Sequence, residues 1–225
     1  ARMNLFLHGI VDGHIEHGDT LAEPKLIDAD GKVQRFNVVL ANPPYSIKDW
    51  NRGAFASDPY GRNMWGTPPQ GRADYAFFQH IAASLAPESG RAAILFPHGV
   101  LFRREEAALR KKLIESDLVE CVLGLGAGLF YNSPMEAVVI TLRASKPEDH
   151  SGKILFINAV NEVAREQAQS FLRESHQKKI LDAYQGFADV EGFAAVVDLD
   201  TIKAKNYSLS IPLYVSGIAT NGATV

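Results

Sequence analysis

The four residues Asn42-Pro43-Pro44-Tyr45 are the part of the sequence whose types and spacing best fit a chemical role. Two consecutive prolines fix the backbone φ angle and remove two N–H donors, so this turn offers carbonyl acceptors without competing donors. The side-chain amide oxygen of Asn42 adds another acceptor. Two acceptors held about one residue apart suit a planar amino group with two hydrogens, such as the exocyclic amine of a base or a carboxamide.

An amino nitrogen of this kind is a poor nucleophile because its lone pair is delocalised. Accepting both hydrogens draws the nitrogen toward tetrahedral geometry and turns the lone pair toward an electrophile, which is positioning and electrostatic stabilisation rather than strong-base catalysis. Tyr45 adds a flat face on which a base can stack, worth about 1–3 kcal/mol per base. The alternative is a rigid structural turn, with Asn42 as a cap and Tyr45 in the core.

The elements that position this turn follow from the hydrophobic pattern. Residues 33–41 end in an apolar, β-branched run directly before Asn42, which predicts a buried parallel strand. Ligands of open α/β sheets bind beyond the carboxyl ends of such strands. Further strands are predicted at 91–97, 119–125, 137–143 and 153–159, with helices at 74–85, 105–115 and 163–184. This alternation predicts an α/β fold with a mainly parallel, doubly wound sheet.

Two segments do not fit this alternation. Residues 46–72 are rich in Gly and Pro and contain both tryptophans, and connections of this length are usually functional lids or disordered. A soft boundary near residues 145–152 divides the chain into two parts, 1–147 and 148–225. The basic residues Arg103, Arg104, Arg110, Lys111 and Lys112 are interrupted by acidic ones, which favours a solvated helix face, with DNA phosphate contact as the alternative.

Composition excludes several classes of protein. With 225 residues, 46% of them hydrophobic, and a net charge of −3 from 23 basic and 26 acidic residues, the chain is neither a disordered tail, a fibre nor a membrane protein. A single cysteine excludes an intrachain disulfide and a thiolate metal cage, and the seven histidines lack paired helical spacing, so we expect no metal site. We expect a cytoplasmic protein. The near-neutral charge means that nucleic-acid binding would need a local patch or a partner.

At the Asn42–Tyr45 turn the chain resembles the S-adenosylmethionine-dependent methyltransferases of amino groups, which carry Asn-Pro-Pro-Tyr or Asn-Pro-Pro-Phe. Its other blocks resemble one family, the modification (methylase) subunit of type I restriction-modification systems, an N6-adenine DNA methyltransferase. The resemblance runs from about residue 3 to 215. It includes the blocks Asn4-Leu5 with His8-Gly9-Ile10, Gly18-Asp19-Thr20-Leu21, Arg72-Ala73-Asp74, Pro97-His98-Gly99-Val100-Leu101-Phe102-Arg103 and Asn206-Tyr207-Ser208-Leu209.

The resemblance implies a Rossmann-like methyltransferase sheet, mainly parallel with an antiparallel strand. It implies that Asn42, Pro43, Pro44 and Tyr45 form the catalytic motif around a flipped adenine and that Asp19 lies near the S-adenosylmethionine. Phe130 or Tyr131 falls where the family places an aromatic residue against the target base, and we favour Phe130. The alternatives are a turn residue for Asp19 and a core residue for Phe130. The implied partners are double-stranded DNA, a DNA specificity subunit and possibly a restriction subunit, in a hetero-oligomer.

The chain departs from the family pattern before Asn42. No glycine-rich loop follows a first strand, and no acidic residue ends a second strand. We therefore expect a C-terminal portion that lacks the N-terminal strands of the sheet and that, alone, binds the cofactor poorly and is inactive. Residues 1–147 would be the C-terminal part of the catalytic domain, and 148–225 a strand and helix extension for subunit or DNA contact.

Three functions remain open from the sequence. The first is adenine-N6 methylation of DNA. The second is methylation of a protein glutamine or an RNA base, because Asn-Pro-Pro-Tyr recurs in those methyltransferases. The third is a non-catalytic assembly piece, in which the predicted helix at 163–184 packs on partner subunits.

Overall fold

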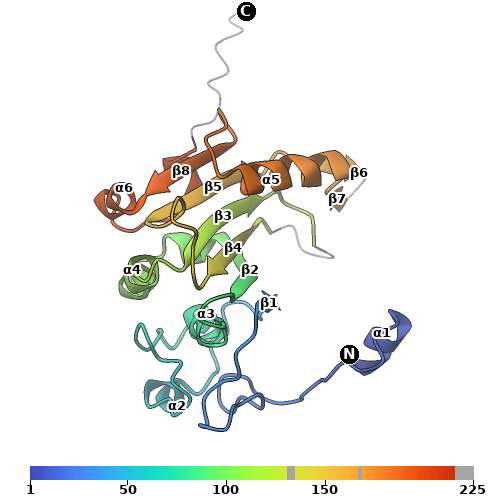
Figure 1. The fold of residues 1–225 in the computed structure, drawn as a ribbon, viewed down its shortest axis with the longest axis vertical. Coiled ribbons are helices and arrows are strands. Elements are labelled where there is room, and N and C mark those ends of the chain that lie inside the picture. Colours follow the sequence, from blue (N-terminus) through green and yellow to red (C-terminus); the bar gives the residue numbers. More distant parts are fainter. Residues whose placement is uncertain (131–134, 167–168, 216–225) are drawn as a thin grey trace, which may run out of the picture.

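A six-stranded mixed sheet organises the chain (Figure 1). The computed structural model describes residues 1–130, 135–166 and 169–215. The order across the sheet is β1-β2-β4-β3-β5-β8. The strands are β1 (Val38–Ala41), β2 (Arg91–Pro97), β3 (Val119–Leu125), β4 (Ala137–Arg143), β5 (Lys153–Ala159) and β8 (Ala194–Asp198). The pairing makes β4 and β8 antiparallel to the other four, so the predicted mainly parallel sheet is confirmed, with β8 as a second reversed strand.

Helices cover both faces of the sheet, as expected for a doubly wound fold (Figure 1). The helices of the described residues are α1 (Arg2–Leu7), α2 (Arg52–Ala56), α3 (Asp74–Ala83), α4 (Ala107–Glu115), α5 (Glu174–Gly186) and α6 (Leu199–Ala204), with short 3-10 turns at η1 (His98–Leu101), η2 (Arg104–Glu106) and η3 (Ile211–Leu213). Of these, α3, α4 and α6 lie on one face of the sheet and α5 on the other, whereas α1 projects away from it (Figure 1). None of the helices in the described ranges is long and apolar enough to cross a membrane.

The larger core lies between the sheet and α3, α4 and α6. Alternate residues of β2, including Ile94 and Phe96, point into it because side chains alternate along a strand. Phe78 of α3 stacks on Phe96 with ring centroids 4.9 Å apart. Burying one such side chain contributes about 1.5–3 kcal/mol. This packing ties α3 to β2, the neighbour of β1, and so fixes α3 beside the Asn42–Tyr45 turn.

The C-terminal extension continues the same sheet. β5 pairs in parallel with β3, and β8 pairs antiparallel with β5. The predicted helix at 163–184 is wrong in its first half, where β6 (Ala164–Glu166) and β7 (Gln169–Phe171) form a hairpin. The amide of Ser170 donates to the carbonyl of Gly128 at 2.9 Å. This contact comes from a distant part of the chain, so local periodicity could not reveal it.

The connection 46–72 is ordered around a buried arginine. Arg62 is 1% exposed and forms a 2.6 Å ion pair with Asp58, whose side chain is equally buried. Arg62 also donates to the carbonyls of Thr20 at 2.7 Å and Leu21 at 2.8 Å. Its guanidinium therefore joins the connection to residues near the start of the chain, and the segment is neither a free lid nor disordered.

We predict that Asp58→Ala lowers the free energy of unfolding by about 3–5 kcal/mol, because it leaves the Arg62 charge buried without its partner. Asp182→Ala is the matched control, since Lys178 and Asp182 form a pair of the same i,i+4 spacing with exposed side chains. Its cost should stay below about 1 kcal/mol. Urea unfolding of both variants measures the difference, and equal losses would contradict the role assigned to Arg62.

Candidate functional site

The Asn42–Tyr45 turn lies at the carboxyl end of β1 and is accessible. Asn42 and Pro44 are exposed, Tyr45 is half-buried and Pro43 is buried. The Tyr45 hydroxyl donates to Asn42 Oδ1 at 2.6 Å. Burial raises the pKa of Tyr45 above its usual value, so the hydroxyl keeps its proton at neutral pH and remains a donor. Tyr45 thus holds the Asn42 carboxamide, whose oxygen has a second lone pair for another donor.

The backbone that leaves this turn is held by α3. Ser46 has a left-handed backbone with φ of 52°, which is unfavourable for a residue with a side chain. Its amide donates to Asp74 Oδ1 at 2.7 Å, and its hydroxyl accepts from Arg72 at 3.3 Å. Asp74 is the first residue of α3 and is fully buried. The amino end of the helix favours its negative charge.

Two further charged residues extend this contact. Arg103 Nη1 donates to Asp74 Oδ2 at 2.7 Å and lies 3.4 Å from Glu106 Oε2. Only 17% of the Arg103 side chain is exposed, and the Glu106 side chain is fully buried. We call Asp74, Arg103 and Glu106 the turn anchor. The sequence analysis missed it, although the blocks Arg72-Ala73-Asp74 and Pro97–Arg103 contain two of its members.

The prediction of a solvated basic face is therefore wrong for two of its residues. Arg103 belongs to the turn anchor, and Arg110 is 3% exposed. Arg110 donates to the carbonyl of Arg103 and to that of Tyr207, both at 2.9 Å. These carbonyls come from outside α4, so helix periodicity could not identify them. Arg104, Lys111 and Lys112 are exposed as expected.

Asp19 closes a turn of its own. Its Oδ1 accepts from the amides of Leu21 at 2.9 Å and Ala22 at 3.0 Å, which is the geometry of the structural alternative. The side chain is exposed. Within the described ranges, no hydrogen bond or ion pair joins Asp19 to the Asn42–Tyr45 turn. Leu21, in the turn that Asp19 closes, packs in a small apolar cluster with Trp50 and Phe55 of the connection 46–72.

Phe130 is half-buried and follows the carboxyl end of β3. β1 and β3 run in the same direction, so Phe130 and Asn42 both lie beyond the carboxyl ends of their strands, on the same side of the sheet's strand ends. No ring contact links Phe130 to Tyr45 among the residues that the structure describes. Tyr131 lies outside the described residues.

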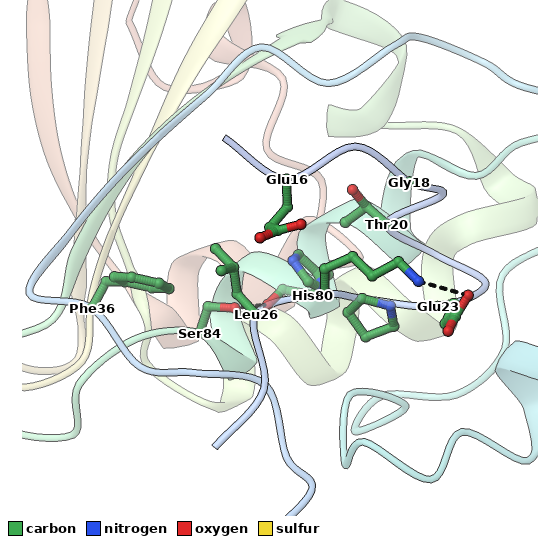
Figure 2. Close-up of a pocket in the computed structure, with 10 residues that line it drawn as sticks. Glu16, Gly18, Thr20, Glu23, Leu26, Phe36, His80 and Ser84 are labelled. Carbon is green, nitrogen blue, oxygen red and sulfur yellow. Dashed lines mark hydrogen bonds and ion pairs between the residues drawn. The ribbon is translucent and has the colours of Figure 1, made fainter. Parts of the chain in front are cut away.

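A cavity of about 170 Å³ lies between the N-terminal segment and α3 (Figure 2). Thr20, Phe36 and His80 are among its lining residues. Burial and the nearby Arg62 lower the pKa of His80 to about 4, with Asp58 opposing, so His80 is neutral at pH 7. Phe36 precedes β1, which places the cavity toward the opposite end of that strand from Asn42. The cavity is therefore separate from the turn.

No group of three or more His, Cys, Asp or Glu side chains is placed to hold a metal ion in the part of the chain that the structure describes.

The chain matches a known protein family along almost its whole length. The sequence pattern of the N-6 DNA Methylase family matches residues 1–222. The chain belongs to the N-6 DNA methylase family. Its fold agrees, since the methyltransferase subunit of a type I restriction-modification system from Streptococcus thermophilus superimposes with a TM-score of 0.86 at 34% identity, covering 96% of this chain and 45% of that one. The resemblance and the Rossmann-like sheet are both confirmed.

Its relatives of similar sequence are methylase subunits of type I restriction enzymes. The MjaVIII methylase subunit of a type I restriction enzyme from Methanocaldococcus jannaschii is 35% identical over 232 residues, which cover 97% of this chain and 39% of that protein. The MpnII methylase subunit from Mycoplasma pneumoniae is 31% identical over 97% of this chain and 41% of its own length. The chain thus spans about two-fifths of the length of these relatives.

We predict that Glu106→Gln flattens the pH dependence of stability between about pH 4.5 and 7. Burial, reinforced by Asp74 and opposed by Arg103, raises the pKa of Glu106 to about 7. A raised carboxyl pKa contributes stability that is full at low pH and is lost as the pH rises through the folded-state value. Glutamine cannot ionise, so the variant should gain on the wild type as the pH rises.

Urea unfolding at a series of pH values measures this difference. Glu105→Gln is the matched control, because the Glu105 side chain is 69% exposed and adjacent in sequence. The control should keep the wild-type slope. Parallel pH profiles for the wild type and Glu106→Gln would show that Glu106 does not titrate in this range.

Proposed function

We propose that the full-length protein is the methylase subunit of a type I restriction-modification system and transfers a methyl group to the N6 atom of a flipped adenine in DNA. In this proposal the Asn42–Tyr45 turn of this chain holds the target base. The observation that carries it is the accessible, donor-poor turn with its fixed Asn42 oxygen at the carboxyl end of β1. Membership of the N-6 DNA methylase family supports the reaction type.

The residues of the turn would act on the amino group by positioning it. Asn42 Oδ1 and the carbonyl of Pro43 accept its two hydrogens, and the prolines supply no competing donor. The acceptors stabilise the positive charge that develops on the nitrogen, whose proton is then released to solvent. Tyr45 offers its ring for stacking, and Phe130 or Tyr131 would contact the base from the β3 side. Extruding the base from the duplex costs a few kcal/mol.

S-adenosylmethionine would supply the methyl group. The described residues fit it only in part. Asp19 offers an exposed carboxylate to an amine of the cofactor, but its Oδ1 already caps a turn. The cavity beside α3, at about 170 Å³, is small against the roughly 300–1,000 Å³ of typical ligand pockets. We propose that the rest of the cofactor site belongs to the remainder of the full-length protein, so this chain alone is inactive.

The outer edge of β1 supports a sheet completed by that remainder. β1 is the edge strand of the sheet, and its apolar residues Val38 and Leu40 are 52% and 79% exposed. Leu40, Asn42, Leu95 and Val139 also line a shallow recess over β1, β2 and β4, on the same face of the sheet as α5 but beyond the part that α5 covers. Further strands and helices of the protein would pair with this edge and cover this face.

The partners would be double-stranded DNA, a DNA specificity subunit and a restriction subunit, in a cytoplasmic hetero-oligomer. A net charge of −3 supports the need for a partner to hold DNA. Residues 148–225 would serve subunit or DNA contact beside the catalytic part at 1–147. The extension has exposed apolar side chains suited to an interface, at Phe171, Leu181, Val190 and Leu213.

We predict that Asn42→Ala lowers the rate of methyl transfer about 100- to 1,000-fold, the cost of losing one oriented electrostatic partner. The assay follows labelled methyl transfer from S-adenosylmethionine to DNA by the complete complex. Asn37→Ala, at the opposite end of β1, is the matched control. A wild-type rate in Asn42→Ala would disprove the assignment. Methyl transfer to ribosomal RNA or to a protein glutamine, without transfer to DNA, would show that DNA is not the substrate.

We predict that Tyr45→Ala weakens capture of the base by about 5- to 150-fold, which corresponds to the loss of about 1–3 kcal/mol of stacking. Tyr45→Phe keeps the ring and loses only the hydroxyl that holds Asn42, so its loss should be smaller. The fluorescence of 2-aminopurine at the target position reports base flipping in both variants. Equal losses would mean that the hydroxyl, rather than the ring, carries the effect.

A further inference from the structure

The turn anchor commits both oxygens of one fully buried carboxylate. Asp74 Oδ1 accepts from the Ser46 amide and Oδ2 accepts from Arg103, each at 2.7 Å. Ser46 directly follows Tyr45 and has a left-handed backbone, a conformation that persists only where its surroundings hold it. Asp74 therefore fixes the direction in which the chain leaves the Asn42–Tyr45 turn.

Glu106 is the unexplained member of the anchor. Its Oε2 lies 3.4 Å from Arg103, while its Oε1 is buried and has no hydrogen-bond partner among the described residues. A buried carboxylate oxygen without a partner destabilises a fold. Stability alone therefore does not account for Glu106. Its charged and titratable surroundings are Arg103, Asp74, Arg72 and Tyr75, with Arg110 beyond Tyr75.

The orientation of Arg103 depends on all of these contacts. Its carbonyl accepts from Arg110, and its guanidinium lies between Asp74 and Glu106. Arginine suits this place because its planar fork offers several donors in a fixed geometry. Glu106 thus holds Arg103, Arg103 holds Asp74, and Asp74 holds the backbone of Ser46.

We propose that Asp74 is a positioning residue for methyl transfer, acting through the Ser46 amide on the Asn42–Tyr45 turn and oriented by Arg103 and Glu106. The proposal rests on the proposed function of that turn. Asp74 is buried and bonds to the backbone beyond Tyr45, so it acts without contacting the base. A displacement of about 1 Å in a reacting group can cost about 100-fold in rate, so a loosened turn should lower kcat.

The test compares Asp74→Asn with a matched buried pair elsewhere. Asparagine keeps the volume of the side chain, but its amino group must face either the Ser46 amide or the Arg103 guanidinium, and both are donors. Glu120→Gln is the control. Glu120 at the start of β3 is 1% exposed and pairs with Arg143 at the end of β4. This pair lies at the opposite end of the strands from the Asn42–Tyr45 turn.

Steady-state kinetics of the complete complex give the first readout. We expect Asp74→Asn to lower kcat about 10- to 100-fold while KM for S-adenosylmethionine changes less than about twofold. Glu120→Gln should lose stability but keep kcat within about twofold. Arg103→Lys, which keeps a charge but loses the fork, should retain more activity than Arg103→Met. A kcat for Asp74→Asn that is unchanged, or lowered no more than in the control, would overturn the proposal.

Hydrogen exchange gives a second readout that does not need activity. In the complete protein the Ser46 amide should exchange faster in Asp74→Asn than in the wild type and in Glu120→Gln. Equal exchange in all three would overturn the proposal even if the complex methylates DNA. If the wild-type complex transfers no methyl group, the proposed function fails, while faster Ser46 exchange would still support the anchoring of the turn by Asp74.

Discussion

The hydrogen bond from the Ser46 amide to Asp74 sets where the chain leaves the Asn42–Tyr45 turn, and much of the fold serves to hold Asp74. Asp74 begins α3, which is held against the sheet by the stacking of Phe78 on Phe96. Arg103, brought in by the turns after β2, neutralises the buried carboxylate. The hydrophobic core fixes the position of α3, and the paired Asp74 at its start holds the Ser46 amide beside the turn.

Buried arginines order the irregular parts of this protein. Arg62 joins the connection 46–72 to Thr20 and Leu21, and Arg110 joins Arg103, the residue before η2, to Tyr207. Each guanidinium satisfies backbone carbonyls that no helix or strand could pair. Lysine would not substitute well, because its compact ammonium cannot reach several acceptors in one plane. Segments of low regular structure are thereby fixed at a few points, so we expect them to be sensitive to substitution of these arginines or their partners.

The strands after residue 90 could be predicted from sequence because their apolar runs are short, dense and bounded by turn residues. The bounds of β3, for example, agree with the predicted 119–125. The Asn42–Tyr45 turn was equally visible, since its prolines and its place after a strand are local features. The turn anchor is not visible in the sequence, because Arg103 meets Asp74 across 29 residues. The burial of Arg110 is equally hidden, because Arg110 meets Tyr207 across 97 residues. Basic residues that look solvated in a helical pattern become buried only through such distant partners.

The exposed edge strand β1 affects how the chain behaves in solution. Val38 and Leu40 lie on the strand that leads directly into the Asn42–Tyr45 turn. An unpaired edge strand with exposed apolar side chains tends to pair with any extended polypeptide nearby, including a second molecule. Any segment that pairs with this edge would also fix the strand that carries the Asn42–Tyr45 turn. Until that edge is covered, we expect self-association through β1 to compete with correct assembly.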